Sequence, residues 1–83
     1  MTTDRVTNRS LTRVEMHAGA PKAFVWRGMR IPVRKVLDDW EEEGCWWLEE
    51  EPRRVYRVLT TNDSVYELHQ LAVSGWELHR AYD

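Results

Sequence analysis

The chain has 83 residues, a formal net charge of −2 and one cysteine, Cys45. A chain of this length has room for a single hydrophobic core and buries only about 60% of the surface that its unfolded form exposes. The lone cysteine excludes an intramolecular disulfide, which a secreted domain of this size would usually need. No apolar run of about 18 residues and no signal peptide is apparent, so we expect a cytoplasmic protein without a membrane partner.

The charges are sorted along the chain. Residues 1–37 carry eight Arg and Lys against two acids, residues 38–51 carry eight acids and no base, and the remainder carries four of each. Such sorting predicts either two surfaces of opposite charge or pairing between them in the fold. Five Trp, three Tyr and one Phe are a heavy aromatic load, which we expect to supply most of the core.

Residues 1–9 have almost no apolar side chains and are expected to form a disordered lead, so the folded domain should span residues 10–83. Short apolar or alternating runs then recur between turn signals such as Arg27-Gly28 and Ser74-Gly75. The seven runs are Leu11–Met16, Ala23–Trp26, Met29–Leu37, Cys45–Leu48, Val55–Thr60, Val65–His69 and Trp76–Tyr82. This spacing predicts an all-β fold, a small antiparallel rolled sheet or barrel of about five to seven short strands.

The stretch from Val33 to Glu43 admits a second interpretation. Its apolar side chains follow the spacing of one helix face: Val33, Val36, Leu37 and Trp40. Ile31 is a poor N-cap, however, and the acids after Leu37 would lie at the negative end of the helix dipole. We therefore favour a strand with a bulge near Lys35, with a helix as the alternative.

Alternation is clearest in Val65–His69 and Trp76–Tyr82, and these two runs should be antiparallel neighbours. We expect Trp26 and Trp76 to be largely buried. The residues placed in the interior are Val14, Met16, Phe24, Trp26, Val33, Tyr56, Val58, Tyr66, Leu68, Trp76 and Leu78. The three histidines, His17, His69 and His79, are placed at solvent-facing positions, and no internal repeat is apparent beyond two Glu triplets.

No catalytic constellation stands out. The serines lie outside a nucleophile elbow, and Cys45 has no histidine near it in the sequence. The Cys and His spacings match no zinc motif, and the triplets Glu41–Glu43 and Glu49–Glu51 lack the ligand spacing of a calcium loop. The four glycines are isolated and form no phosphate loop. We therefore expect no enzyme activity, no metal and no cofactor.

Arginines and aromatic side chains interleave in the middle of the chain. This combination is common where single-stranded nucleic acid binds, because arginines neutralise phosphates and exposed rings stack on bases. It is also expected of a β-domain whose aromatics fill the core and whose arginines pair with surface acids. The candidate partner-binding residues are Arg27, Arg30, Arg34, Trp46, Trp47, Arg53, Arg54 and Arg57.

Trp46 and Trp47 are adjacent, and on a strand neighbouring side chains point to opposite faces. One ring can then enter the core, while the other meets solvent, a covering loop or a partner. An exposed Trp beside Arg is a typical anchor of a protein interface. Our first hypothesis is a non-catalytic protein-interaction module, and the alternative is a domain that binds single-stranded nucleic acid.

Several segments together resemble a family of small bacterial domains, common in actinobacteria. They are Trp26–Arg30, Val33–Trp40, Gly44–Trp47, Arg57–Val58, Val65–Leu68 and Trp76–Asp83. The match covers roughly residues 13–83, and it departs from the family at Asn62-Asp63-Ser64, where Asp-Gly is common. The paired Trp and the ending Tyr82-Asp83 are also similar to the C-terminal segment of Y-family polymerase-like proteins of mutagenic translesion synthesis. The resemblance implies an accessory or docking domain connected with DNA damage tolerance, without catalytic residues.

Overall fold

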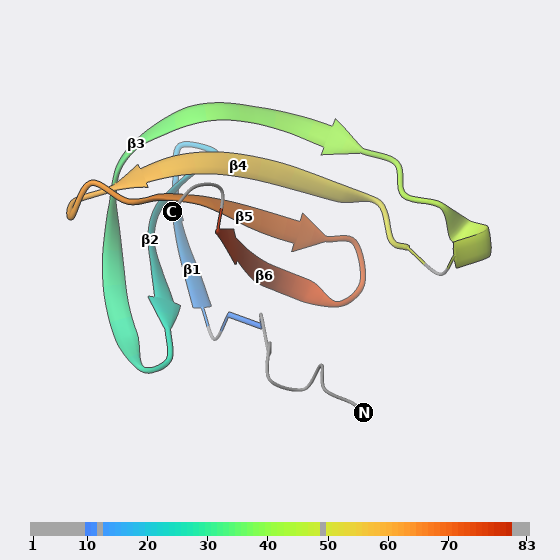
Figure 1. Cartoon of the computed structure of the whole chain (residues 1–83), viewed down its shortest axis with the longest axis horizontal. Coiled ribbons are helices and arrows are strands. Elements are labelled where there is room, and N and C mark those ends of the chain that lie inside the picture. The colour runs from blue at the N-terminus through green and yellow to red at the C-terminus, as the bar shows by residue number, and fades with distance from the viewer. Residues whose placement is uncertain (1–9, 12, 49, 81–83) are drawn as a thin grey trace.

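The computed structural model describes residues 10–11, 13–48 and 50–80, in which six antiparallel strands form one meander that curls into a half-barrel (Figure 1). The strands are β1 (Arg13–His17), β2 (Ala20–Trp26), β3 (Met29–Glu42), β4 (Arg53–Thr60), β5 (Val65–Leu71) and β6 (Gly75–Arg80). Each strand pairs with the next one along the chain. The all-β prediction is therefore confirmed, whereas the disordered lead expected over residues 1–9 lies outside the described residues.

The first two hairpins close through two-residue turns, Ala18-Gly19 and Arg27-Gly28. In both turns the two residues have positive φ, +52° and +82° in the first and +52° and +79° in the second. Positive φ at both central positions is the type I′ geometry, whose twist matches that of the paired strands. The turns therefore set the pairing of β1 with β2 and of β2 with β3.

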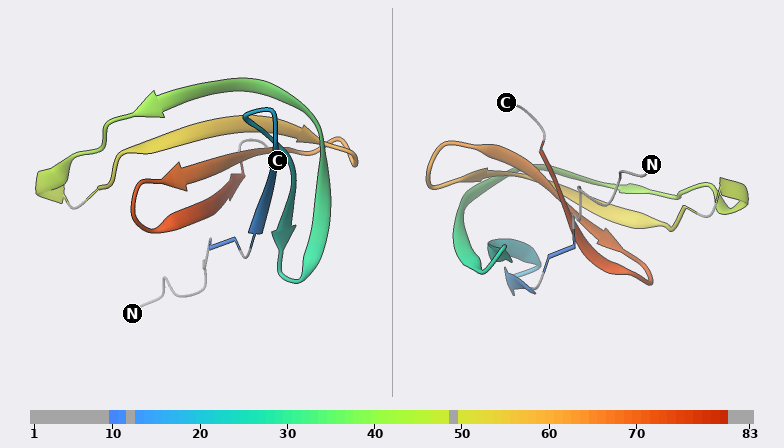
Figure 2. Two further views of the ribbon diagram at one scale, coloured as in Figure 1. Left: turned by 180° about the vertical axis from the view of Figure 1, so that it is seen from behind. Right: turned by 60° about the horizontal axis from the view of Figure 1, so that its bottom comes forward.

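β3 is the longest strand, and it carries the curl of the sheet. Its first part pairs with β2 and its second part with β4, so the chain passes along β3 from one side of the half-barrel to the other (Figure 2). The pairing with β4 shifts between Val33 and Lys35 and again between Val36 and Asp38. Such shifts bend and twist a strand. The bulge predicted near Lys35 is confirmed, and the helical alternative is wrong, because two bulges in an alternating strand produce apolar spacings of three and four.

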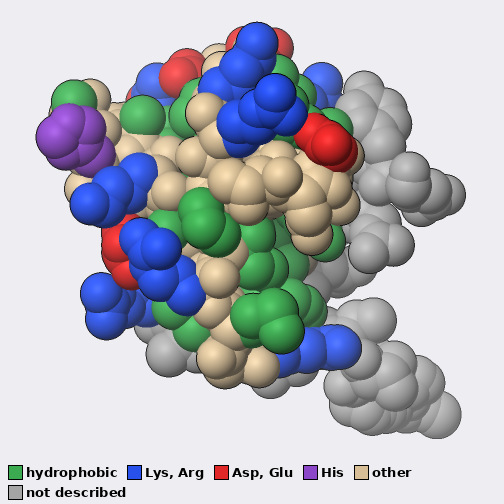
Figure 3. All heavy atoms as spheres, turned by 90° about the vertical axis from the view of Figure 1, so that its left-hand side faces the viewer, with side chains coloured by type: hydrophobic (Ala, Val, Ile, Leu, Met, Phe, Trp, Pro, Cys, Tyr) green, Lys and Arg blue, Asp and Glu red, His purple; other side chains and the backbone are tan. Residues whose placement is uncertain are grey.

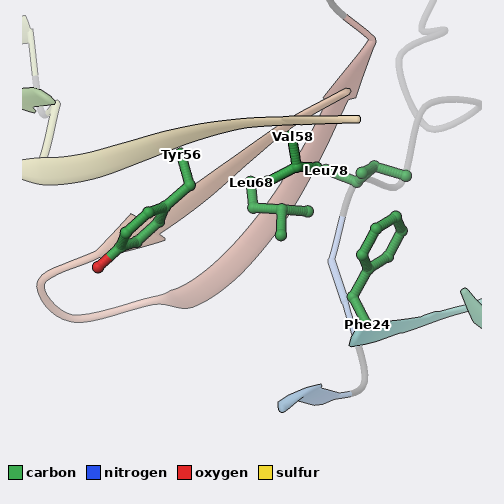
Figure 4. Packing of buried hydrophobic residues seen from close by; sticks show 5 residues of the cluster. All are labelled: Phe24, Tyr56, Val58, Leu68 and Leu78. Carbon is green, nitrogen blue, oxygen red and sulfur yellow. The ribbon is translucent and has the colours of Figure 1, made fainter. Parts of the chain in front are cut away.

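The hydrophobic core lies on the concave side of the half-barrel. Its buried centre consists of Phe24 from β2 and four side chains from β4 to β6, namely Tyr56, Val58, Leu68 and Leu78 (Figure 4). Partly buried hydrophobic side chains pack around this centre: Leu11, Val14, Trp26, Ile31, Val33, Val36, Tyr66 and Trp76. The two ends of the meander meet where the backbone N–H of Leu11 donates to the carbonyl of Trp76 at 3.0 Å.

Two details of the predicted interior differ in the structure. Met16 is 40% exposed, because the pairing of β1 with β2 shifts between Glu15 and Met16 and interrupts the alternation. Trp26 and Trp76, expected to be largely buried, are partly buried at the margin of the core. Among the described residues, no helix has the length and apolar character needed to cross a membrane.

Candidate functional site

The six candidate arginines divide into two groups. Arg27, Arg30 and Arg34 lie on the β2–β3 turn and the first part of β3, whereas Arg53, Arg54 and Arg57 lie on β4. Figure 3 views the side of the molecule opposite the β3–β4 connection and shows Lys and Arg side chains in several groups, with hydrophobic side chains between them. We use the name basic side for the five basic residues of β2, the β2–β3 turn and the first half of β3: Lys22, Arg27, Arg30, Arg34 and Lys35.

Most candidate arginines are neutralised by an acid within the fold. The pairs, with their N···O distances, are Arg30–Glu15 (2.9 Å), Arg34–Asp63 (2.8 Å), Arg54–Glu41 (2.9 Å) and Arg57–Glu67 (2.9 Å). The hydrogen bonds from Arg30 lower the pKa of Glu15 to about 2. Arg27 instead lies over the ring of Trp26, at 4.9 Å from its centroid, and pairs with no acid among the described residues. Paired arginines are less available to phosphates than free ones.

The two tryptophans lie in the connection between β3 and β4, not on a strand. The strand predicted over Cys45–Leu48 is wrong, because Trp46–Leu48 form one turn of 3-10 helix, labelled η2. The expectation that the two rings point to opposite faces of a sheet therefore does not apply. Trp47 is 67% exposed and Leu48 is 62% exposed. We call these two side chains the tip.

Backbone interactions hold the connection in a defined shape. Gly44 has a φ of +78°, and a Cβ built on it would lie 2.6 Å from the carbonyl oxygen of Glu50, so glycine is required there. The carbonyl of Cys45 accepts the N–H groups of Leu48 at 2.8 Å and Glu50 at 3.0 Å. These bonds close a turn that presents the tip outward.

The connection is also fastened to the β5–β6 turn. The carboxylate of Glu51 accepts the backbone N–H groups of Val73 at 2.8 Å and Ser74 at 2.9 Å, as well as the Ser74 hydroxyl. These hydrogen bonds, with the one from the hydroxyl as the largest cause, lower the pKa of Glu51. The N–H of Ala72 donates to the carbonyl of Pro52 at 2.9 Å. Two connections far apart in the sequence therefore brace each other.

Acidic residues are frequent at the end of β3 and in the connection that carries the tip. Arg54 neutralises Asp39 and Glu41, and Glu42 accepts a hydrogen bond from the indole N–H of Trp40 at 2.9 Å. Glu43 and Glu50 are exposed and form no ion pair among the described residues. This end of the half-barrel therefore keeps a negative charge.

An open hollow of about 440 Å³ lies at the same end, where β3 and β5 end and β4 begins. Three acidic residues line it: Glu41, Glu42 and Glu43. Apolar groups of Pro52, Leu71 and Ala72 also contribute to it. Gln70, Arg53 and Arg54 line the hollow as well. Arg54 is paired with Glu41 and Arg53 is directed to the ring of His69, so Glu42 and Glu43 are lining acids without an ion pair among the described residues.

A second cluster lies on the outer face of β5 and β6. The rings of His69 and His79 stack with their centroids 3.9 Å apart. Nδ1 of His69 lies 3.0 Å from the guanidinium of Arg53, which can only donate, so Nδ1 accepts and the proton lies on Nε2. That Nε2–H donates to Glu67 at 3.0 Å. His69 is only 7% exposed, so its predicted solvent-facing position is wrong, and burial lowers its pKa.

This cluster arises from a repeat that the sequence analysis missed. An aromatic residue followed by Glu-Leu-His occurs at residues 66–69 and again at residues 76–79. Antiparallel pairing places Leu68 opposite Leu78 in the core and Glu67 opposite His79 on the outer face. Within the described part of the chain, however, no three His, Cys, Asp or Glu side chains are arranged to hold a metal ion.

The chain belongs to the family described as domain of unknown function DUF6504, whose model matches residues 3–81. No curated protein and no solved structure matches it. The family match agrees with the resemblance to a family of small domains noted from the sequence. Nothing in these comparisons assigns a reaction or a ligand.

Proposed function

We propose that this member of the DUF6504 family is a non-catalytic docking module that binds a protein partner through its tip, Trp47 and Leu48. The observation that carries the proposal is the exposure of two large apolar side chains, 67% and 62%, side by side in a braced connection. Aromatic anchors of this kind contribute a large share of the binding energy at protein interfaces. A contact that covers the Trp47 ring removes much apolar surface from water, since a Trp side chain buries about 150–250 Å².

The bracing of the connection also supports a binding role. Association is weakened by the entropy lost when loops become ordered at an interface. Gly44 and the hydrogen bonds to Cys45 and Glu51 already order the backbone that carries the tip. The partner therefore meets a surface that needs little further ordering, which favours affinity.

The DNA-damage-tolerance role remains part of the proposal. The similarity of the paired Trp and of the chain end to the C-terminal segment of Y-family polymerase-like proteins points to a partner in a cytoplasmic DNA repair or translesion assembly. In that setting the module recruits another protein and performs no chemistry itself.

A second candidate function is the binding of single-stranded nucleic acid on the basic side. The position of Arg27 over the Trp26 ring favours it, because a cation and an aromatic ring occur together there without an acid paired to that cation among the described residues. Four of the six candidate arginines are neutralised by acids, so the protein-docking proposal comes first.

One experiment separates the two candidates. The wild-type chain, Trp47→Ala and Met29→Ala are immobilised and exposed to lysate of the source cells, and retained proteins are quantified by mass spectrometry. Met29 is a matched control because it is 66% exposed and lies at the β2–β3 turn. We expect a protein that wild type and Met29→Ala retain and Trp47→Ala loses. The basic side would be favoured instead if Trp47→Ala retained the same proteins as wild type and the chain bound an oligonucleotide with an affinity that falls steeply with salt.

A further inference from the structure

We infer that the partner segment docking at the tip is a basic, apolar peptide, with apolar side chains on Trp47 and Leu48 and a Lys or Arg side chain in the hollow, beside Glu43. This inference rests on the proposed function, and it adds the chemical class of the partner. Its basis is that the tip, the hollow and the excess of carboxylates all lie at one end of the half-barrel.

The charge balance at this end is the first argument. Residues 38–54 contain eight acids and two bases, Arg53 and Arg54. Arg54 forms ion pairs with Asp39 and Glu41, and Arg53 forms a hydrogen bond with a ring nitrogen of His69. Among the residues that the structure describes, Glu43 and Glu50 therefore remain exposed next to the tip without an ion pair, and a cationic partner would supply the counter-charge. Complementary charge of this kind raises the association rate and selects among partners.

The shape and lining of the hollow are the second argument. A Lys or Arg side chain has an apolar stem and a charged head, and it binds well where an apolar wall leads to carboxylates. Leu71 and Ala72 provide such a wall, and Glu42 and Glu43 are acids beside it without an ion pair among the described residues. The two arginines that also line the hollow are occupied, Arg54 by Glu41 and Arg53 by the ring of His69. Glu51 does not compete for the cation, because its carboxylate is occupied by the N–H groups of Val73 and Ser74.

A second copy of the chain is a weaker occupant. Its basic side has the right charge, but the β2–β3 turn that carries part of it lies far from the β3–β4 connection with the tip on each molecule (Figure 1). Contact between two different surfaces of identical chains adds copies head to tail and leaves both ends open unless a ring closes. A separate basic peptide can bind the same surface in a complex that adds no further copies, so we assign a peptide as the occupant.

The test is a selection from a phage-displayed library of random linear peptides against the intact chain, followed by titration of the enriched peptides by fluorescence anisotropy. We expect the enriched sequences to combine Lys or Arg with aromatic or branched aliphatic residues. Trp47→Ala should weaken binding of the best peptide about tenfold or more, as for loss of an aromatic anchor. The double variant Glu43→Gln, Glu50→Gln should weaken it several-fold and reduce its dependence on salt.

Two control variants carry matched changes elsewhere. Met29→Ala removes an equally exposed apolar side chain, and Asp63→Asn removes one carboxylate on the β4–β5 turn while keeping a residue that tolerates its φ of +65°. Both should bind the peptide as wild type does. Enriched peptides that depend on Trp47 but carry no basic residue would overturn this inference and leave the docking function standing. Peptides that ignore Trp47 would overturn both, and self-association that Trp47→Ala abolishes would identify a second copy as the occupant.

Discussion

Substitution of Val55 tests whether the outer face of the sheet contains a packed layer of its own. It lies on β4 with its side chain away from the concave core, yet it is 0% exposed. Its register partners are Trp40 on β3 and His69 on β5, and Arg57 lies over the Trp40 ring at 5.2 Å from the centroid. We attribute the burial of Val55 to these polar and aromatic neighbours.

Val55→Ala removes two carbon atoms, which corresponds to about 1.6 kcal/mol of transfer free energy at about 0.8 kcal/mol per carbon. The residual cavity raises the expected loss to about 2–3 kcal/mol. A domain of 83 residues has a free energy of unfolding of about 4–12 kcal/mol, so the loss is a large fraction of the total. The melting temperature should fall by about 10–20 °C.

The assay is urea denaturation followed by Trp fluorescence, with two control variants. Val58→Ala makes the same change at a fully buried position of the concave core and should cost a similar amount. Val73→Ala makes it at a position that is 86% exposed and should change the free energy of unfolding by less than about 0.5 kcal/mol. If Val55→Ala behaves like Val73→Ala, the packed outer layer does not form in solution.

Three further predictions concern stability. Because burial lowers the pKa of His69 below its ordinary 6.5, the unfolded chain binds a proton before the folded chain does, so the free energy of unfolding should fall as pH drops below about 6.5. His69→Gln should make that fall shallower in urea titrations at several pH values, and an unchanged slope would contradict the assignment. Gly44→Ala should lower the melting temperature, because its Cβ would clash with the Glu50 carbonyl at a φ of +78°, and an unaltered melting temperature would mean that the connection is not tight. EDTA should leave the melting temperature unchanged, and a decrease would reveal a structural metal.

The hairpins and the bulged strand were predictable because their signals are local. Gly19 and Gly28 mark two-residue turns, and alternation on either side of them identifies the paired strands. The β3 bulge was also predictable, because Ile31 and the acids after Leu37 oppose a helix. In each case the residues that decide the local structure are close to it in the sequence.

The β3–β4 connection was not predictable from the same signals. Cys45–Leu48 is a short apolar run after Gly44, which is the pattern of a buried strand. Its structure depends instead on bonds to Cys45 and on the contact of Glu51 with Ser74, 23 residues away. Trp47 is exposed, but the strand from which we expected one of the two rings to be exposed does not form there.

The outer-face cluster has one feature that the sequence could not predict and one that it could. Burial of Val55 and His69 depends on which residues the register places beside them, and that register is a property of the whole meander. The repeated Glu-Leu-His, in contrast, was visible in the sequence. Comparing residues 66–69 with residues 76–79 would have indicated that the two strands present the same pattern to each face of the sheet.

Site-specific photo-cross-linking from the tip tests the docking proposal most directly. Trp47 is replaced by p-benzoylphenylalanine in the full chain inside the source cells, and Met29 is replaced in the same way in a control of equal exposure. We expect a discrete cross-linked protein from position 47 that is absent from position 29. Identical products from both positions, or no product from position 47, would contradict the claim that the tip is a protein-docking site.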